Sequence, residues 1–329
     1  MAVKNTTQKT LADASVNLGG RKFGLDRINE MVDWNRIDAY FTDYYKSNRG
    51  QQAYAPLMKF KILLVQSMHN LSDPAMEEML LRDLVFRRFV GLGISDEVPD
   101  HSTIWRFREQ LEENQLFETL FQEVNNQLEE QGLIIKVGQA SIIDATVIEA
   151  QRSRPKKNEK GESTQDPEAE YFTKRNAKGK RETTYGYKAH VNCDEDGFIM
   201  KATFTPANVH DSKELIHLLT GNDAAVYADK AYTSKAHDEL LEKLGVKNRI
   251  LKKAYRNRPL TKEEKETNRV HSDTRSIIER VFGTLKLHYG IAKSRYLGRV
   301  RNHVRFIMCA MGYNLKRAIT IQKNCLTRG

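Results

Sequence analysis

Hydrophobic residues recur at helical spacing through the first 133 residues of the chain. After Pro56, the apolar side chains of Phe60, Leu64 and Met68 follow one another every four residues, which predicts a helix with one buried face. Similar patterns predict a helix over 73–91 capped by Asp73, one from Pro99 onward, one over 115–130 and a short segment over 25–45. We therefore predict an all-helical N-terminal domain over 25–133, after a polar tail over 1–24.

The periodicity changes after Gly132. Residues 133–150 have a β-rich pattern, and two alternating stretches, Tyr185–Cys193 and Phe198–Phe204, flank a turn and predict a β-hairpin. Further strands are predicted over 224–228 and 248–252, and helices over 213–219, 234–244, 274–289 and 302–320. This order predicts an α/β fold, a mixed sheet flanked by helices, for a domain over 134–320 that precedes a tail over 321–329.

Two segments of this second domain have few aliphatic residues and many charges. Residues 151–184 are dense in Lys, Arg, Glu and Asp, which favours a mobile loop. Residues 253–273 are predicted to form a basic linker before the long helix.

The net charge of +10 is unevenly distributed. From Lys247 to the end there are 21 Lys/Arg and 5 Asp/Glu, whereas the rest of the chain holds the remaining 32 Lys/Arg and 38 Asp/Glu. Such an excess favours a polyanionic partner, because phosphates neutralised by a protein release their counterions. A solvated basic face is the alternative, and charge alone does not decide between them.

Composition also indicates the cellular compartment in which the protein is expected. Hydrophobic residues make up 40% of the 329, no apolar run is as long as a membrane span, and the first residues lack an apolar export signal. The three cysteines, Cys193, Cys309 and Cys325, have no metal-site spacing, which favours reduced thiols in a cytoplasm.

Two carboxylates fall at positions where burial is expected. Asp144 lies inside the apolar strand sequence Ser141-Ile-Ile-Asp-Ala-Thr146, and Asp229 follows the apolar Val226-Tyr-Ala. Burying a carboxylate costs several kcal/mol unless it is paired or binds a cation. Either residue alone suits a loop-capping role, but neighbouring strands are about 4.8 Å apart, so two strand-end carboxylates can converge on one divalent ion.

A third carboxylate lies on the predicted helix over 274–289. Steps of about 100° per residue place Arg275, Glu279 and Lys286 within about 40° of one another, whereas Ile278 and Val281 lie on another face that would pack against the sheet. An exposed Arg275–Glu279 pair is the alternative interpretation. In the company of the aspartates, this face predicts a metal site, with Mg²⁺ as the ion that suits acidic oxygens and with cations that hold a DNA backbone.

These motifs, in this order, resemble the DDE transposases of bacterial insertion sequences. The residues that carry the resemblance are Asp144-Ala-Thr, Tyr185-Gly-Tyr-Lys-Ala-His190, Thr205-Pro-Ala-Asn-Val-His-Asp211, Asp229-Lys-Ala-Tyr232 and Arg275…Glu279…Lys286, together with Asn70-Leu-Ser-Asp-Pro-Ala-Met-Glu and Pro99-Asp-His-Ser-Thr-Ile-Trp-Arg-Phe-Arg108 in the helical region. The nearest match is the IS-five family, with the related IS-four family. Ser272 stands where the IS-four signature has a tyrosine.

The resemblance implies an RNase H-like catalytic domain whose triad is Asp144, Asp229 and Glu279. It also implies Mg²⁺ or Mn²⁺, with two ions expected, as cofactor, and the cleavage of double-stranded DNA at terminal inverted repeats with transfer into target DNA. The helical N-terminal domain is then expected to bind DNA or to dimerise, because two ends must be held at once. A bacterial cytoplasm, at the nucleoid, is the expected location.

Further residues are candidates for DNA contact or for support of the triad. The DNA-binding candidates are Arg275, Lys286, Lys188, His190, Arg280, Arg256, Arg258, Arg106 and Arg108. Lys188 and His190 share one strand face, which either looks toward Asp144 or faces solvent. His210, Asp211 and Tyr232 are candidates for a supporting shell, with a helix cap as the alternative for His210-Asp211, and Trp105 is expected in the core.

Two other functions fit the same pattern. One is a catalytically silent DNA-binding protein derived from a transposase, and the other is a plain RNase H-like nuclease that cleaves without joining. Three convergent carboxylates argue against the first, and the basic last quarter together with the helical domain argues against the second.

Overall fold

The computed structural model describes residues 22–42, 44, 52–134, 140–152, 158–159, 161, 165–175, 179–256 and 258–328. The chain forms two compact units, one of residues 1–133 with 307–329 and the other of residues 134–306. The predicted tail over 1–24 lies almost wholly outside the described residues. The last helix contributes to both units, whereas the sequence pattern assigned it as far as residue 320 to the second domain alone.

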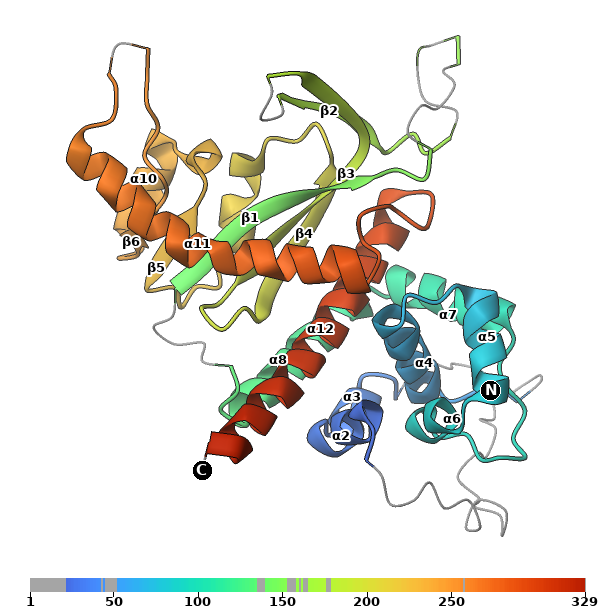
Figure 1. Cartoon of the computed structure of the whole chain (residues 1–329). Helices are drawn as coiled ribbons and strands as arrows, with labels where there is room; N and C mark the ends of the chain where they lie inside the picture. Colours follow the sequence, from blue (N-terminus) through green and yellow to red (C-terminus); the bar gives the residue numbers. More distant parts are fainter. Residues whose placement is uncertain are drawn as a thin grey trace. The chain divides into compact units, whose positions relative to one another are not determined.

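The first unit is helical, as its periodicity predicted (Figure 1). Its helices are α2 (Gly24–Met31), α3 (Trp34–Ala39), α4 (Pro56–Met68), α5 (Asp73–Arg82), α6 (Leu84–Val90), α7 (His101–Glu113), α8 (Leu116–Glu130) and the end of α12 (Arg299–Arg328). Phe60, Leu64 and Phe107 are fully buried in its core.

Helix caps explain two differences from the predicted boundaries. Ser72, rather than Asp73, caps α5, because its hydroxyl accepts a hydrogen bond from the Ala75 amide. The predicted helix over 73–91 is interrupted at Asp83, whose carboxylate accepts from the Val85 and Phe86 amides and so starts α6. A side chain that caps a new helix ends the one before it.

Among the described residues, the second unit is built on a mixed six-stranded sheet. Its strands are β1 (Ala140–Glu149), β2 (Glu170–Arg175), β3 (Arg181–Cys193), β4 (Ile199–Pro206), β5 (Ala225–Ala228) and β6 (Lys247–Asn248). β1 pairs antiparallel with β3 and parallel with β5, β6 continues parallel to β5, and β3 also pairs antiparallel with β2 and β4. This mixed sheet with its helices is the expected RNase H-like fold.

Helices cover both faces of the sheet at β1 and β5. On one face, Ile143 and Val226 pack with α9 (Leu215–Leu218) and α10 (Lys235–Lys243) in a buried cluster. Tyr227 points to the other face and meets His271 of α11 (Lys262–His288), with ring centroids 5.4 Å apart. α11 lies across β1 there (Figure 1), so it covers the face that carries Asp144.

Several segments differ from the expected secondary structure. The strand expected over 248–252 is the two-residue β6 at Lys247–Asn248. β2 and the start of β3 lie within 151–184, expected to be a mobile loop, because aromatic and β-branched residues at Tyr171–Thr173 pair with Thr183–Tyr185. α11 begins at Lys262, inside the expected linker over 253–273, because Thr261 and Glu264 form a capping box. α12 continues to Arg328, through most of the expected tail over 321–329.

Candidate active site

The strand register brings Asp144 and Asp229 next to each other. The last residues that pair between the parallel strands β1 and β5 are Ile143 and Ala228, and each aspartate is the next residue along its strand. Neighbouring strands are about 4.8 Å apart, so the two carboxylates leave the sheet side by side. The structure thus brings together the two residues that the cost of burying a carboxylate singled out.

Asp144 has an arginine partner. Its Oδ2 accepts from the Arg275 guanidinium at 2.8 Å, and its Oδ1 accepts from the Ala145 amide at 2.8 Å. Burial raises the pKa of Asp144 to about 6 against the opposing effect of Arg275, and the charges of Asp229 and Asp211 raise it as well. The carboxylates therefore repel one another, and a divalent cation between them would relieve that repulsion.

Asp211 belongs to this acidic cluster and pairs with Lys188 of β3. Its Oδ1 lies 2.8 Å from Lys188 Nζ, which also donates to the Val209 carbonyl at 2.8 Å. The neighbouring His210 is the cap of a short 3-10 helix at Asp211–Glu214, since its Nδ1 accepts from the Ser212 amide at 3.3 Å. The cap therefore describes His210, whereas a supporting role for Asp211 stays a prediction.

Neither alternative for Lys188 and His190 describes their position. They pair across β3 and β1 with Val147 and Ala145, so their side chains leave the sheet on the face opposite to that of Asp144. Yet both are buried rather than facing solvent. His190 is fully buried, with its Nε2 2.8 Å from Thr205 Oγ1, and burial lowers its pKa to about 4. This burial contradicts a direct DNA contact by His190.

Tyr232 lies within the same cluster of charges. Its side chain is fully buried, and its pKa is raised by burial, then by Asp144 and Asp211, against the opposing effect of Arg275, with Asp229 contributing too. Among the described residues, no hydrogen-bond partner is found for its hydroxyl. A buried hydroxyl of this kind, close to three carboxylates, is a donor available to them or to a ligand.

Glu279 is exposed on α11, one helical turn beyond the buried Arg275. Its helix crosses the strand of Asp144, but no hydrogen bond or ion pair joins Glu279 to either aspartate in the described part of the chain. Within that part, no three His, Cys, Asp or Glu side chains are grouped closely enough to hold one metal ion. Two carboxylates do fit Mg²⁺, which commonly takes one or two and completes its shell with water and substrate phosphate.

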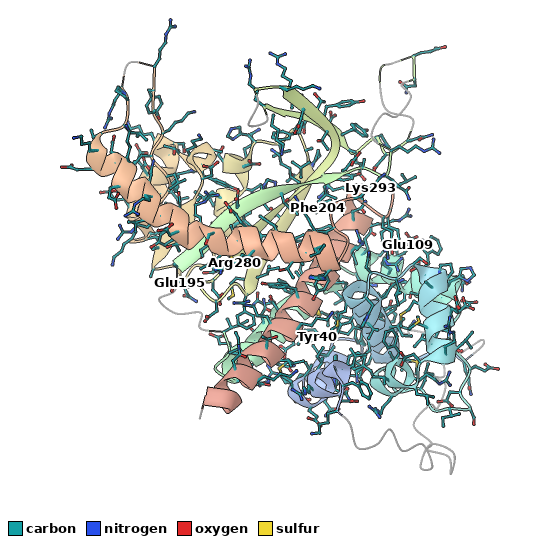
Figure 2. The ribbon with its side chains drawn as sticks, in the orientation of Figure 1. Tyr40, Glu109, Glu195, Phe204, Arg280 and Lys293 are labelled. Atoms are coloured by element: carbon teal, nitrogen blue, oxygen red, sulfur yellow. The ribbon has the colours of Figure 1, made fainter. Side chains whose placement is uncertain are left out.

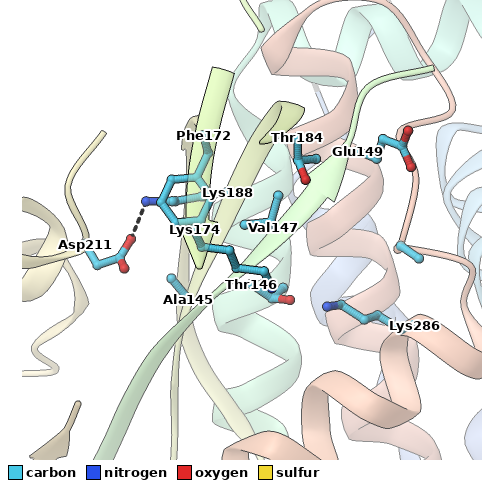
Figure 3. Close-up of a pocket in the computed structure, with 11 residues that line it drawn as sticks. Ala145, Thr146, Val147, Glu149, Phe172, Lys174, Thr184, Lys188, Asp211 and Lys286 are labelled. Atoms are coloured by element: carbon cyan, nitrogen blue, oxygen red, sulfur yellow. Dashed lines mark ion pairs between the residues drawn. The ribbon is translucent and has the colours of Figure 1, made fainter. Parts of the chain in front are cut away.

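A polar pocket of about 490 Å³ opens along β1, directly after Asp144 (Figure 3). Its lining includes Ala145 and Thr146 from β1, and three lysines from three different elements: Lys174 of β2, Lys188 of β3 and Lys286 of α11. Asp211 also lines it and is joined to Lys188 in Figure 3. A concave, cationic surface beside an acidic cluster suits the backbone of a nucleic acid.

The remaining residues that were predicted to contact DNA are either exposed or buried. Arg106, Arg256, Arg258 and Arg280 are exposed, the last labelled on α11 in Figure 2. Arg108 is buried and donates to Asp73 and to Gln66, so its assignment to DNA is wrong. Trp105 was expected in the core but is 42% exposed, because it lies on the outer face of α7, away from Ile104 and Phe107.

The sequence interpretation missed two residues of β2 that lie against the pocket. Phe172 and Lys174 line it, and the Phe172 ring centroid is 4.2 Å from Lys188 Nζ. The signal was present in the alternation of Tyr171–Thr173 and Thr183–Tyr185, but the many charges around them outweighed it.

Comparison with known proteins identifies related domains. A family model described as a transposase DDE domain matches residues 136–315, more than half of the chain, and a second, described as a transposase domain (DUF772), matches residues 19–110. A chain in the crystal structure of a pre-cleavage Mos1 transpososome is 14% identical, over 80% of this chain and 96% of that chain, with a TM-score of 0.20. A TM-score this low does not show that the two chains share a fold. No helix in the described part of the chain is long and apolar enough to cross a membrane.

Proposed function

This chain belongs to the family of transposase DDE domains, and on that premise we propose that it cleaves DNA strands at the ends of a mobile element and joins them to target DNA. The observation that carries the proposal is the parallel register of β1 and β5, in which Ile143 pairs with Ala228, so that Asp144, within β1, neighbours Asp229, directly after β5. The order of the sequence motifs supports the bacterial IS-five family within it.

We propose that Asp144 and Asp229 bind Mg²⁺ or Mn²⁺, with Glu279 as the third acidic ligand and two ions in the complete site. The carboxylates repel one another when no cation is between them, which supports this assignment. A bound divalent ion supplies Lewis acidity, which lowers the pKa of a water or 3′-hydroxyl and neutralises charge on the phosphate.

The protein's own residues orient these groups. Arg275 holds one oxygen of Asp144 and the Ala145 amide holds the other, so the carboxylate has a fixed direction. Tyr232, buried among the same charges, is proposed as a supporting residue. Lys286, Arg280, Arg256 and Arg258 are proposed to contact the backbone of double-stranded DNA, and Arg106 to contact it from the helical unit.

Two element ends must be held together for joining, so we propose that at least a dimer assembles on the terminal inverted repeats. The helical unit is proposed to bind these repeats or to dimerise. A substrate of this kind places the protein at the nucleoid in a bacterial cytoplasm.

The first experiment measures nicking of DNA that contains an element end, with and without Mg²⁺. We expect Asp144→Asn to abolish nicking, a loss of at least about 10³-fold, because it removes charge from the proposed metal site. Asp273→Asn is the matched control, since Asp273 is an exposed carboxylate on α11 that precedes Arg275 by two residues. Nicking that survived in Asp144→Asn would exclude the proposed mechanism.

A second experiment supplies pre-cut ends and a target duplex. The proposed function predicts joined products, whereas a plain nuclease cleaves without joining and a silent DNA-binding protein does neither. Joining, rather than cutting, is therefore the result that identifies a transposase.

A further inference from the structure

The β2 strand contributes a lysine to the pocket beside the acidic cluster. Lys174 and Phe172 alternate on β2, so they share the strand face that lines the pocket. β2 is held in place by pairing with β3 from Glu170 to Arg175. The position of Lys174 is therefore set by the sheet rather than by a loop.

Lys286 approaches the same pocket from α11. Partial burial lowers the pKa of Lys286, and the charge of Lys174 lowers it further, so the two ammonium groups lie near each other. Figure 3 shows both side chains at the pocket. Two cations held near each other repel, and an anion between them would replace that repulsion with attraction.

The pocket's other charges do not neutralise this pair. In the part of the chain that the structure describes, neither Lys174 nor Lys286 forms an ion pair, whereas Lys188 is paired with Asp211. The only ion pair drawn among the lining residues in Figure 3 is that one. Glu149 also lines the pocket, but no ion pair joins it to either lysine among those residues. The three lysines and the two carboxylates, Asp211 and Glu149, therefore leave the lining one net positive charge.

Hydroxyl groups complete the lining with neutral donors. Thr146 of β1 and Thr184 of β3 both face the pocket. Lysines with nearby hydroxyl donors are the usual partners of phosphate oxygens. The pocket's volume of about 490 Å³ is large enough for a phosphodiester and its sugars.

We propose that Lys174 and Lys286 together bind one backbone phosphate of the DNA strand that runs past Asp144, which makes β2 a DNA-binding element. This inference rests on the proposed function for the identity of the anion. Ala145 and Thr146 connect the pocket to Asp144 through consecutive residues of β1. Asp211 lines the pocket and its charge also acts on Asp144, so a DNA strand at the carboxylates can extend into the pocket.

The test is a double-mutant cycle on the binding of full-length protein to a duplex of arbitrary sequence, without divalent ions so that no strand is cut. Lys174→Gln and Lys286→Gln should each weaken binding several-fold and reduce the slope of log K against log salt by about 0.9, the value for one phosphate contact. The double variant should be little weaker than either single one, because both remove the same contact.

Arg175→Gln is the matched control. Arg175 is exposed and follows Lys174, so it lies on the other face of β2. In the double variant Arg175→Gln with Lys286→Gln, the fold-loss of DNA affinity should equal the product of the losses in the two single variants. Circular dichroism checks that each exposed-site variant keeps its fold.

Several results would overturn the inference. One is an affinity of Lys174→Gln for the duplex equal to that of the wild type. Another is a double variant whose loss of affinity equals the product of the two single losses. A third is a wild-type protein that does not bind the duplex. A site for free phosphate rather than for DNA is a further contrary result: inorganic phosphate at constant ionic strength would then bind to the wild type but not to Lys174→Gln, while the two proteins bound DNA equally. The cleavage assay separates the two proposals. If the wild type cuts DNA but Lys174→Gln binds DNA as tightly as the wild type, only this inference is rejected. If the wild type does not cut DNA but the effects of the two lysine substitutions on binding are not additive, only the proposed function is rejected.

Discussion

His303 on α12 stacks on Phe204 of β4, with ring centroids 5.9 Å apart. Burial, and to a smaller extent the nearby Arg299, lowers the pKa of His303 to about 4. An unfolded histidine takes up its proton near pH 6.5, whereas the folded one does so only near pH 4. The folded state therefore loses stability as pH falls through that window.

The corresponding prediction concerns His303→Gln. Between pH 6.5 and 4, the free energy of unfolding of the wild type should fall more steeply than that of the variant, by up to about 3 kcal/mol at the acid end. Urea denaturation at several pH values measures this difference. Parallel pH profiles for the two proteins would show that His303 does not cause the acid sensitivity.

Asp166 is a buried carboxylate that the sequence pattern did not single out. It accepts hydrogen bonds from the Tyr187 hydroxyl and, at 2.9 Å, from the Gly298 amide. Its φ of 86° lies in the left-handed region, which Asp and Asn tolerate better than other non-glycine residues. One side chain thus ties the segment before β2 to β3 and to the start of α12.

We expect Asp166→Ala to lower the free energy of unfolding by about 1–3 kcal/mol, because it leaves the buried Tyr187 hydroxyl and the half-buried Gly298 amide without an acceptor. Asp166→Asn should cost less, since it keeps an oxygen at the same position and tolerates the same φ. Thermal unfolding of both variants tests this order, and equal losses would contradict the proposed role of the acceptor oxygen.

Single residues were predictable where burial has a clear cost. Asp144 and Asp229 could be identified because carboxylates interrupt apolar strands. Arg108 could not, because its pairing with Asp73 joins two helices that are far apart in sequence. Nor could the pairing of Lys188 with Asp211, since it depends on how a hairpin approaches a 3-10 helix.

Gly186 allows the close pairing of β1 and β3. A Cβ atom at this position would overlap the Ile148 carbonyl oxygen and approach the Ala150 amide nitrogen to 2.8 Å. Both are backbone atoms of β1 or its end, so neither can move without separating the strands. Gly186 is also part of the Tyr185–His190 motif, and close backbone approach gives a physical reason for a glycine there.

At this element we predict that Gly186→Ala lowers the free energy of unfolding by about 3 kcal/mol or more, or prevents folding of the second unit. Gly283→Ala is the matched control, because no atom lies within 4 Å of its added Cβ. That control should stabilise α11 by about 1 kcal/mol, since alanine favours a helix interior. Chemical denaturation compares them, and a mild effect of Gly186→Ala would contradict the close contact.

Elements were predicted well where apolar periodicity was strong and poorly where charge dominated. The helices of the first unit and strands β1, β3, β4 and β5 follow their hydrophobic patterns. For β2 and the first turns of α11, the sequence pattern predicts a loop and a linker, because their side chains are mostly polar and exposed. There the backbone is fixed by strand pairing and by a capping box rather than by a buried face.

At the scale of the whole molecule, the first unit is discontinuous in sequence, because it combines residues 1–133 with residues 307–329. α12 from residue 307 onward belongs with the N-terminal helices. Ile307, Met311 and Leu315 are buried, and Asn314 donates to Asn125 of α8 at 2.9 Å. The helices within 22–133 thus lack part of their core without residues 307–329.

We predict that a fragment of residues 22–133 has low helicity and no cooperative unfolding transition by far-UV circular dichroism. Adding a peptide of residues 299–328 should restore both, since it supplies the missing apolar face. The same peptide with Leu315→Asp is the control, and should fail because it would bury a charge. A fragment that unfolded cooperatively by itself would contradict the division.

The path of α12 also concerns the order in which the protein is made. A ribosome releases the chain from its N-terminus, and domains generally fold as they emerge. Residues 134–306 emerge before residues 307–329, so the second unit can be complete while the helical unit still waits for α12. A product that stops before α12, even one that carries Asp144, Asp229 and Glu279, therefore lacks a finished N-terminal unit. Synthesis through α12 is a condition for both units to be folded in one molecule.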